Sequence, residues 1–215
     1  MQRWPFPCLL LAALVMGCET PGSMPGGSDG EPPYFTETFE KTSTLPDGWI
    51  ELNGEVSFTN GVLQLPAEPL EPHGVMFGPA FTDGLRVAAK FRAEKNKRQM
   101  PTFSLGLNGV SGYRLRVNPP KKKLELLRND SVVNAIEFLW EEGAWTHLTL
   151  EVKALPGLQW EVKGSVWVDG TIRDEVPTVM WKDADAPLAG RPTVWATPFA
   201  GKPVEVDDLR LWRVD

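Results

Sequence analysis

The sequence predicts an all-β protein, a sandwich of two antiparallel sheets. Apolar and polar residues alternate with a period of two in many short segments, as in strands with one buried and one solvated face. Turn-forming pairs such as Asn60-Gly61 separate these segments every 8 to 12 residues or so, as in sandwiches and barrels. The chain has 215 residues, is 42% hydrophobic and contains nine Trp, which is enough material for one core.

Residues 1–17 have the features of an export signal. Arg3 precedes the apolar run Cys8–Met16, and the small residue Gly17 ends it. A membrane-spanning helix needs about 20 apolar residues, so this run is too short to span a bilayer. We therefore expect residues 1–17 to be a cleaved signal peptide.

The segment Val15–Cys18 resembles the lipobox of bacterial lipoproteins. The resemblance implies that Cys18 is lipidated with a diacylglycerol and a further acyl chain, and two chains anchor a protein stably. Residue 19 is Glu instead of the Asp that favours inner-membrane retention in Gram-negative bacteria. The expected location is therefore extracytoplasmic and lipid-anchored, at the bacterial outer membrane. The alternative is a simple secretory signal cleaved near Gly17.

Residues 18–33 form the predicted tether between the lipid and the domain. They are rich in Gly and Pro and too polar to form a core. A flexible coil of this length reaches about 20 Å. The domain covers residues 34–215. Both cysteines, Cys8 and Cys18, precede it, so the domain has no disulfide and no cysteine–metal site.

Strands follow one another through the whole domain, about a dozen in total. The pair Asn60-Gly61 joins the segments 56–58 and 62–65, which predicts a β-hairpin. The alternation is clearest in four longer segments, residues 85–92, 103–107, 113–117 and 159–168. Further turns are expected at Asp83-Gly84, Ser111-Gly112, Asn118–Pro120, Asn129-Asp130, Asp169-Gly170 and Gly201–Pro203.

The order of these features resembles the concanavalin A-like jelly rolls, in the branch near laminin-G-like and 3-keto-disaccharide hydrolase-like domains. The features are an opening strand at Phe39-Glu40, a long strand after Asp83-Gly84, a strand begun by Trp145, a later strand ending in Asp169-Gly170, and the closing strand Val206–Leu211. The resemblance covers nearly all of residues 34–215 and implies a jelly-roll sandwich.

Three tryptophans fall on polar strand faces, where so large an apolar side chain is unusual: Trp167, Trp195 and Trp212. Arg114 and Arg116 alternate with apolar residues in the segment 113–117. Flat rings beside charged groups suit a sugar, because the ring stacks on the apolar sugar face and polar groups bind the hydroxyls. These five residues are the candidate ligand-binding set. The alternative is that loops cover the rings and make them part of the core.

Acidic residues near the C-terminus offer two further candidate sites. Glu205-Val206-Asp207 resembles part of the Glu-x-Asp-x-Glu pattern of family 16 glycoside hydrolases, but Leu209 replaces the second Glu, so no catalytic residue is assigned. In many domains of the superfamily a structural calcium lies between the first and last strands. The resemblance makes Glu40, Asp207 and Asp208 candidate calcium ligands. No other cofactor is expected.

The remaining motifs exclude several classes of function. A net charge of −6 disfavours nucleic-acid binding. The two histidines, His73 and His147, lack a zinc-binding pattern. The basic run Lys121–Lys123 and the basic loop around Lys95–Arg98 are expected to be solvated surface, although an acidic polysaccharide or anionic lipid could use that loop.

We therefore expect a membrane-anchored surface lipoprotein with a non-catalytic, carbohydrate-binding β-sandwich. Its expected partners are a membrane, through the lipid anchor, and a glycan. One alternative is a glycoside-processing enzyme of the 3-keto-disaccharide hydrolase-like type. Another is an envelope scaffold or adhesion protein.

Overall fold

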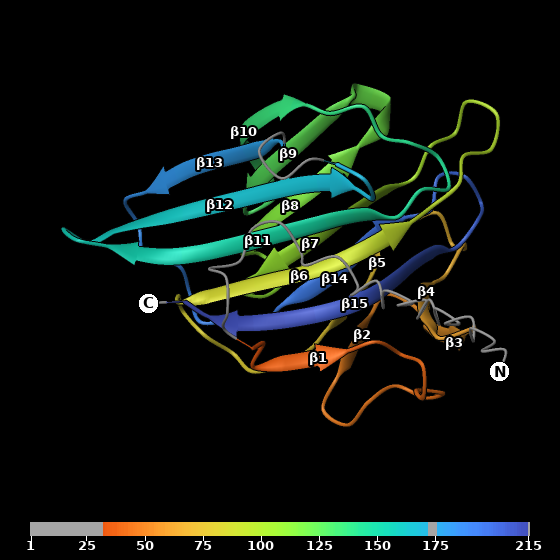
Figure 1. Cartoon of the computed structure of the whole chain (residues 1–215), viewed down its shortest axis with the longest axis horizontal. Helices are drawn as coiled ribbons and strands as arrows, with labels where there is room; N and C mark the ends of the chain where they lie inside the picture. Colours follow the sequence, from red (N-terminus) through yellow and green to blue (C-terminus); the bar gives the residue numbers. More distant parts are fainter. Residues whose placement is uncertain (1–31, 172–175, 215) are drawn as a thin grey trace, which may run out of the picture.

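The computed structural model describes residues 32–171 and 176–214, which form fifteen strands and one 3-10 helix. The all-β prediction is confirmed (Figure 1). The expected signal peptide, Cys18 and most of the expected tether lie outside the described residues. The described ranges contain no helix with the length and hydrophobicity that crossing a bilayer requires.

The first sheet, which we call sheet A, has eight strands paired antiparallel. Seven follow one another in space, and β1 (Phe35–Glu37) pairs with β15 as well. The spatial order is β13 (Thr178–Asp183), β12 (Gln159–Val168), β11 (Thr146–Leu155), β6 (Leu85–Arg92), β15 (Val204–Arg213), β4 (Val62–Leu65) and β3 (Ser57–Thr59).

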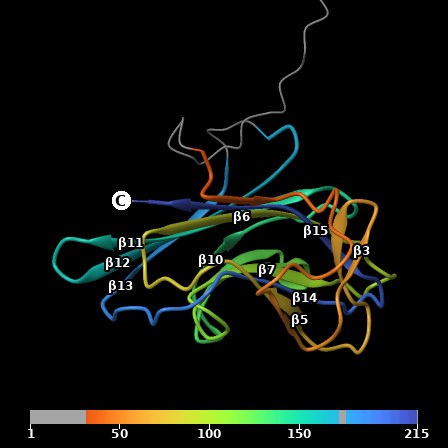
Figure 2. The ribbon, with the colours of Figure 1, turned by 90° about the horizontal axis from the view of Figure 1, so that it is seen from below.

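The second sheet, sheet B, has seven antiparallel strands and forms the other layer, as the edge-on view in Figure 2 shows. The 3-10 helix Pro119–Lys121 lies in the turn between two of its strands. The spatial order is β10 (Ser131–Glu137), β9 (Lys123–Arg128), β8 (Tyr113–Asn118), β7 (Thr102–Leu107), β14 (Thr193–Thr197), β5 (His73–Met76) and β2 (Ile50–Leu52).

The alternation located several strands correctly. β6 and β12 have the predicted bounds 85–92 and 159–168. The predicted hairpin is also present, because Asn60 and Gly61 join β3 to β4. Their φ angles of 54° and 72° are both positive, as the favoured two-residue hairpin turn requires.

The opening strand was predicted in the wrong place. We expected it at Phe39-Glu40, whereas β1 ends at Glu37. The Oε1 atom of Glu37 accepts hydrogen bonds from the backbone N–H of Phe39 at 2.7 Å and from the hydroxyl of Thr42 at 3.1 Å. Phe39 has a φ of 56°, and its buried ring packs edge-on against Trp49. Burial of this ring therefore ends the strand.

The core lies between the inner faces of the two sheets. Phe91 of β6 stacks on Phe103 of β7, with ring centroids 5.1 Å apart. Gly164 of β12 also faces inward, and a Cβ atom there would lie 2.4 Å from Cδ1 of Leu115 in β8. Glycine is required at this position because the sheets approach closely. The outer face of each sheet carries most of the polar side chains.

Candidate functional site

A groove lies on the outer face of sheet B and encloses about 380 Å³. Three of the five predicted ligand-binding residues, Trp195, Arg114 and Arg116, line it. The strand register explains its shape. Trp195 of β14 is opposite Ser104 of β7, and Ser104 is opposite Arg116 of β8. The small serine therefore leaves a hollow between two large side chains.

Trp195 forms the floor of the groove. On its other side the register pairs it with Gly74 of β5, and a Cβ atom at Gly74 would lie 2.7 Å from the indole ring. The ring can lie this low only because Gly74 has no side chain. Trp195 is 6% exposed, so it offers little free ring surface for stacking. Its buried indole N–H has no hydrogen-bond partner among the described residues.

Arg114 reaches across the groove toward Trp195. Its guanidinium carbon lies 5.1 Å from the centroid of the indole ring, within the range of a cation–π contact. One terminal nitrogen, Nη2, donates to the backbone carbonyl of Val110 at 3.0 Å and lies 2.7 Å from Oδ1 of Asp130. Burial lowers the pKa of Arg114, although Asp130 opposes this effect. The guanidinium is thus a partly desolvated cation.

Arg116 is held in a tighter network. Its Nε and Nη2 atoms donate to Oε2 of Glu125 at 2.8 and 2.6 Å. Glu125 is buried and also accepts from Asn118 at 3.0 Å and from Lys121 at 3.3 Å. Burial alone would raise the pKa of Glu125, but these donors lower it. The network fixes Arg116 and neutralises much of its charge.

Neutral polar groups complete the groove. Thr102, Ser104 and Thr197 present hydroxyls, which both donate and accept hydrogen bonds. Asn53 lies at one border and donates to the backbone carbonyl of Pro72 at 3.2 Å. A groove with a ring, a cation and hydroxyls suits a polar ligand that carries many hydroxyl groups.

Trp167 and Trp212 lie on the opposite side of the sandwich, on the outer face of sheet A. Trp167 is 5% exposed and stacks on His147 with centroids 5.1 Å apart and an interplanar angle of 10°. Trp212 lies beneath the guanidinium of Arg86, 4.6 Å from the ring centroid. The structure therefore does not bring these two rings together with Trp195.

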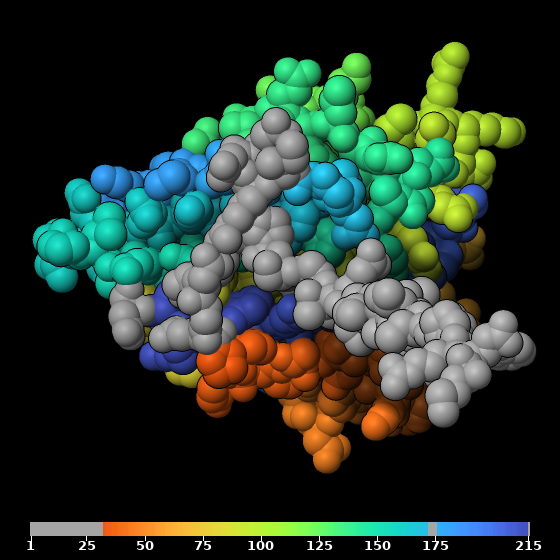
Figure 3. Space-filling view, viewed as in Figure 1, coloured from red at the N-terminus to blue at the C-terminus, as the bar shows by residue number. Residues whose placement is uncertain are grey.

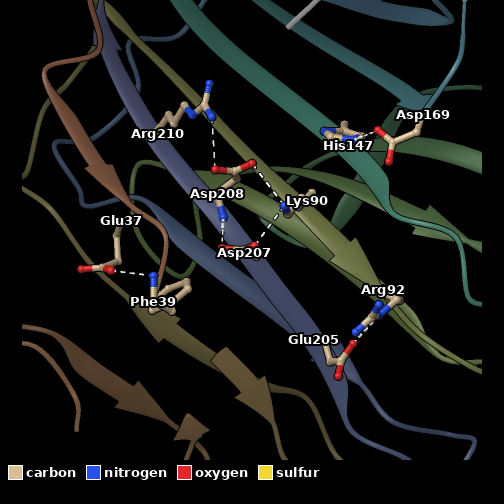
Figure 4. A network of polar contacts seen from close by, with 10 residues as sticks. All are labelled: Glu37, Phe39, Lys90, Arg92, His147, Asp169, Glu205, Asp207, Asp208 and Arg210. Carbon is tan, nitrogen blue, oxygen red and sulfur yellow. Dashed lines mark hydrogen bonds and ion pairs between the residues drawn. The ribbon is translucent and has the colours of Figure 1, made fainter. Parts of the chain in front are cut away.

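The candidate calcium ligands do not fit a cation site. Lys90 lies between Asp207 and Asp208, with its ammonium 3.0 and 3.2 Å from their carboxylates (Figure 4). Asp208 also lies 3.1 Å from Arg210. An ammonium thus already holds the place that a cation would need. The described residues contain no group of three His, Cys, Asp or Glu side chains placed to hold a metal, and Glu40 is exposed.

The pKa values of the two neighbouring aspartates shift in opposite directions, although burial acts the same way on both. Burial raises the pKa of Asp207, although the hydrogen bond from Lys90 opposes this. Burial would also raise the pKa of Asp208, but Lys90 and Arg210 lower it. The other carboxylate of the incomplete glycosidase pattern, Glu205, lies 2.5 Å from Arg92. Each carboxylate of this strand therefore has a basic partner.

The basic loop between β6 and β7 projects from the body of the molecule, where its yellow-green side chains extend into solvent (Figure 3). Residues 94–99 are all exposed, as expected for a solvated surface. Lys95 pairs with Glu142 at 3.0 Å, and Lys202 pairs with Glu94. The structure does not bring this loop to the groove.

Several groove residues were not predicted from the sequence. Ser104 was recognised only as a polar residue of a strand, and Asp130 only as part of a turn. The period-two pattern predicted the strand that contains Ser104, and the pair Asn129-Asp130 predicted a turn. Their membership of the groove depends on β7, β8 and β14 lying side by side.

No family model and no curated protein sequence matches this chain. Solved structures do. The carbohydrate recognition domain of Emp47p is 12% identical with a TM-score of 0.58, and the match covers 84% of this chain and 95% of that domain. Carbohydrate-binding module CBM66 from Bacillus subtilis is 14% identical with a TM-score of 0.56, covering 79% and 96%.

A third similar structure is the exoplasmic/lumenal domain of VIP36 in its Ca²⁺/Man3GlcNAc-bound form. It is 11% identical with a TM-score of 0.61, and the match covers 84% of this chain and 88% of that one. At these identities the likeness shows the fold alone. It confirms the predicted concanavalin A-like jelly-roll sandwich of two antiparallel sheets.

Proposed function

We propose that this chain is a membrane-anchored surface lipoprotein that binds carbohydrate in the groove of sheet B without catalysing a reaction. The observation that carries the proposal is the assembly of Trp195, Arg114 and Arg116 around a hollow lined by hydroxyls. Its volume of about 380 Å³ falls in the range of small-molecule sites.

The chemistry of the groove suits saccharides. Guanidinium N–H groups donate hydrogen bonds to sugar oxygens. The hydroxyls of Thr102, Ser104 and Thr197 can either donate hydrogen bonds to sugar hydroxyls or accept hydrogen bonds from them. The indole of Trp195 supplies an apolar floor. The similar structures support the proposal, because Emp47p, CBM66 and VIP36 carry carbohydrate-binding names or ligands on this fold. Because a fold alone does not assign a function, the proposal depends on the residues that line the groove.

The number of carboxylates in the groove favours binding without catalysis. A retaining glycosidase needs two carboxyl groups about 5 to 5.5 Å apart. Among the described residues that line the groove, Asp130 is the one carboxylate, and it pairs with Arg114. The net charge of −6 also disfavours nucleic acid as the ligand.

The anchor in this proposal is Cys18, with residues 1–17 as its signal and residues 18–33 as the tether. Glu19 favours the outer membrane of a Gram-negative host. Phe35 pairs with Leu211, so the described chain begins and ends at the same end of sheet A. A lipid tether joined at this end leaves the outer face of sheet B open to extracellular ligand.

A glycan array probed with the full chain in detergent tests the proposal. We expect binding to at least one saccharide, and Trp195→Ala should weaken it about tenfold or more, as for a buried aromatic anchor. Trp167→Ala is the matched control, because Trp167 is equally buried on the opposite sheet. Wild-type protein that binds no glycan, or equal losses in both variants, would overturn the assignment.

A further inference from the structure

Arg114 has unused hydrogen-bonding capacity. A guanidinium offers five N–H donors, and the two partners of Arg114, Val110 and Asp130, both lie on Nη2. The described residues offer no acceptor to its Nε and Nη1 atoms. Its side chain is nevertheless only 15% exposed, so water solvates the cation poorly. A guanidinium whose N–H donors have few hydrogen bonds to water or protein is suited to bind an anion.

The present partner of Arg114 can be displaced. Asp130 is 69% exposed at the turn between β9 and β10, so water solvates its carboxylate readily once it leaves Arg114. The partner of Arg116 differs, because Glu125 is 4% exposed and has three donors around it. Only the Arg114 end of the groove is therefore available to an external anion.

The position of Arg114 is also well defined. The contact with the Trp195 ring and the hydrogen bond to Val110 restrain the guanidinium before a ligand arrives. A guanidinium that is already restrained loses less conformational entropy when a ligand binds than the side chain of a free surface arginine does.

We propose that the groove selects acidic carbohydrate, with a sugar carboxylate bound to the guanidinium of Arg114 in the place that Asp130 now occupies. This inference rests on the proposed function and specifies its ligand class. Once Asp130 is displaced, the carboxylate accepts two parallel hydrogen bonds, one from Nη2 and one from the adjacent nitrogen of the guanidinium. The hydroxyls of Thr102 and Ser104 bind the rest of the saccharide.

Paired probes separate charge from shape. Oligogalacturonate and its methyl ester have the same sugar rings, but the ester carries no charge. Titration calorimetry with the full chain in detergent should show about tenfold tighter binding of the acid. The difference should shrink as salt is added, because screening weakens the ion pair. Sialyllactose and its methyl ester form a second acid–neutral pair, which distinguishes a uronate from another acidic sugar.

Three variants locate the effect. Arg114→Gln should reduce binding of the acid to the level of the ester. Asp130→Asn should strengthen binding of the acid several-fold, because it removes the competing carboxylate. Arg92→Gln is the matched control on sheet A, since Arg92 also lies over a tryptophan, Trp145, and pairs with a carboxylate. Its binding of both probes should match that of the wild type.

The outcomes separate the two proposals. Equal binding of acid and neutral probes, unchanged in Arg114→Gln, would overturn acid selectivity and leave carbohydrate binding standing. Absence of binding to every saccharide would overturn both proposals. Melting temperatures identify an unfolded variant, and Asp130→Asn keeps the test decisive if Arg114→Gln does not fold.

Discussion

The hydroxyl of Tyr113 donates a 2.6 Å hydrogen bond to Oδ2 of Asp183, and this bond joins the two sheets. Tyr113 belongs to β8 of sheet B, and Asp183 belongs to β13 of sheet A. Arg128 of β9 also reaches Asp183, at 2.5 Å. Burial and the nearby carboxylate raise the pKa of Tyr113. One buried carboxylate therefore ties together the ends of three strands.

Tyr113→Phe should lower the free energy of unfolding by about 1–2 kcal/mol, because Asp183 then loses a donor while buried. The variant should still fold, since Arg128 continues to compensate the charge. Urea unfolding measures the change. The chain has two tyrosines, and the other, Tyr34, is 63% exposed. Tyr34→Phe is therefore the control, and equal effects of the two substitutions would refute an inter-sheet role.

Gly164→Ala should destabilise the domain by about 1–3 kcal/mol through overpacking. The new methyl group would overlap Leu115, whose Cδ1 lies 2.4 Å from the Cβ position. Adding Leu115→Val should make the double variant more stable than the sum of the single effects predicts, because it relieves the same overlap. Strictly additive unfolding energies would show that the two residues do not compete for space.

His147 should make stability depend on pH. Burial lowers its pKa from the usual 6.5, and the hydrogen bond with Asp169 only partly opposes this. The unfolded chain therefore binds a proton more readily than the folded one. The contribution of neutral His147 to the stability of the fold is complete above the pKa of His147 in the unfolded chain. It is lost as the pH falls through the pKa of His147 in the folded protein.

Melting temperatures between about pH 7.5 and 5.5 test this sign. The wild type should lose stability on acidification. His147→Phe keeps an aromatic ring to stack on Trp167 but cannot titrate, so its decline should be shallower. Parallel curves for the two proteins would assign the pH dependence to other groups.

Calcium or a chelator should leave the melting temperature of the wild type unchanged, because Lys90 already neutralises Asp207 and Asp208. Lys90→Met should cost about 1–2 kcal/mol, because Asp207 loses its basic partner and Asp208 keeps only Arg210. Added calcium should then restore part of the loss in that variant alone. A calcium-dependent shift in the wild type would contradict this assignment of the carboxylates.

Cys18→Ser should release the protein from the membrane. The lipids attached at this residue are the proposed anchor, and the substitution removes their attachment point. Membrane fractionation of cells and mass spectrometry of the N-terminal peptide provide the measurements. The wild type should carry the mass of the lipid on Cys18, and an unmodified Cys18 in membrane-derived protein would exclude the anchor.

Local chemistry was enough to predict a large part of the fold. The bounds of β6 and β12, and the hairpin at Asn60-Gly61, follow from the polarity and turn propensity of neighbouring residues. The opening strand was misplaced because the ring of Phe39 finds its burial site in residues distant along the chain. The local sequence at Phe39-Glu40 does not indicate where the ring of Phe39 is buried.

Period-two alternation predicts the fold class and the strand faces of Trp195, Arg114 and Arg116, because side-chain alternation is a property of the local extended backbone. Which faces meet depends on the tertiary structure. Pairing between distant segments places β14 beside β7, and so Trp195 beside Arg114, while Trp167 falls on the other sheet. Strand order depends on long-range hydrogen bonds and shared burial, which a period of two does not encode.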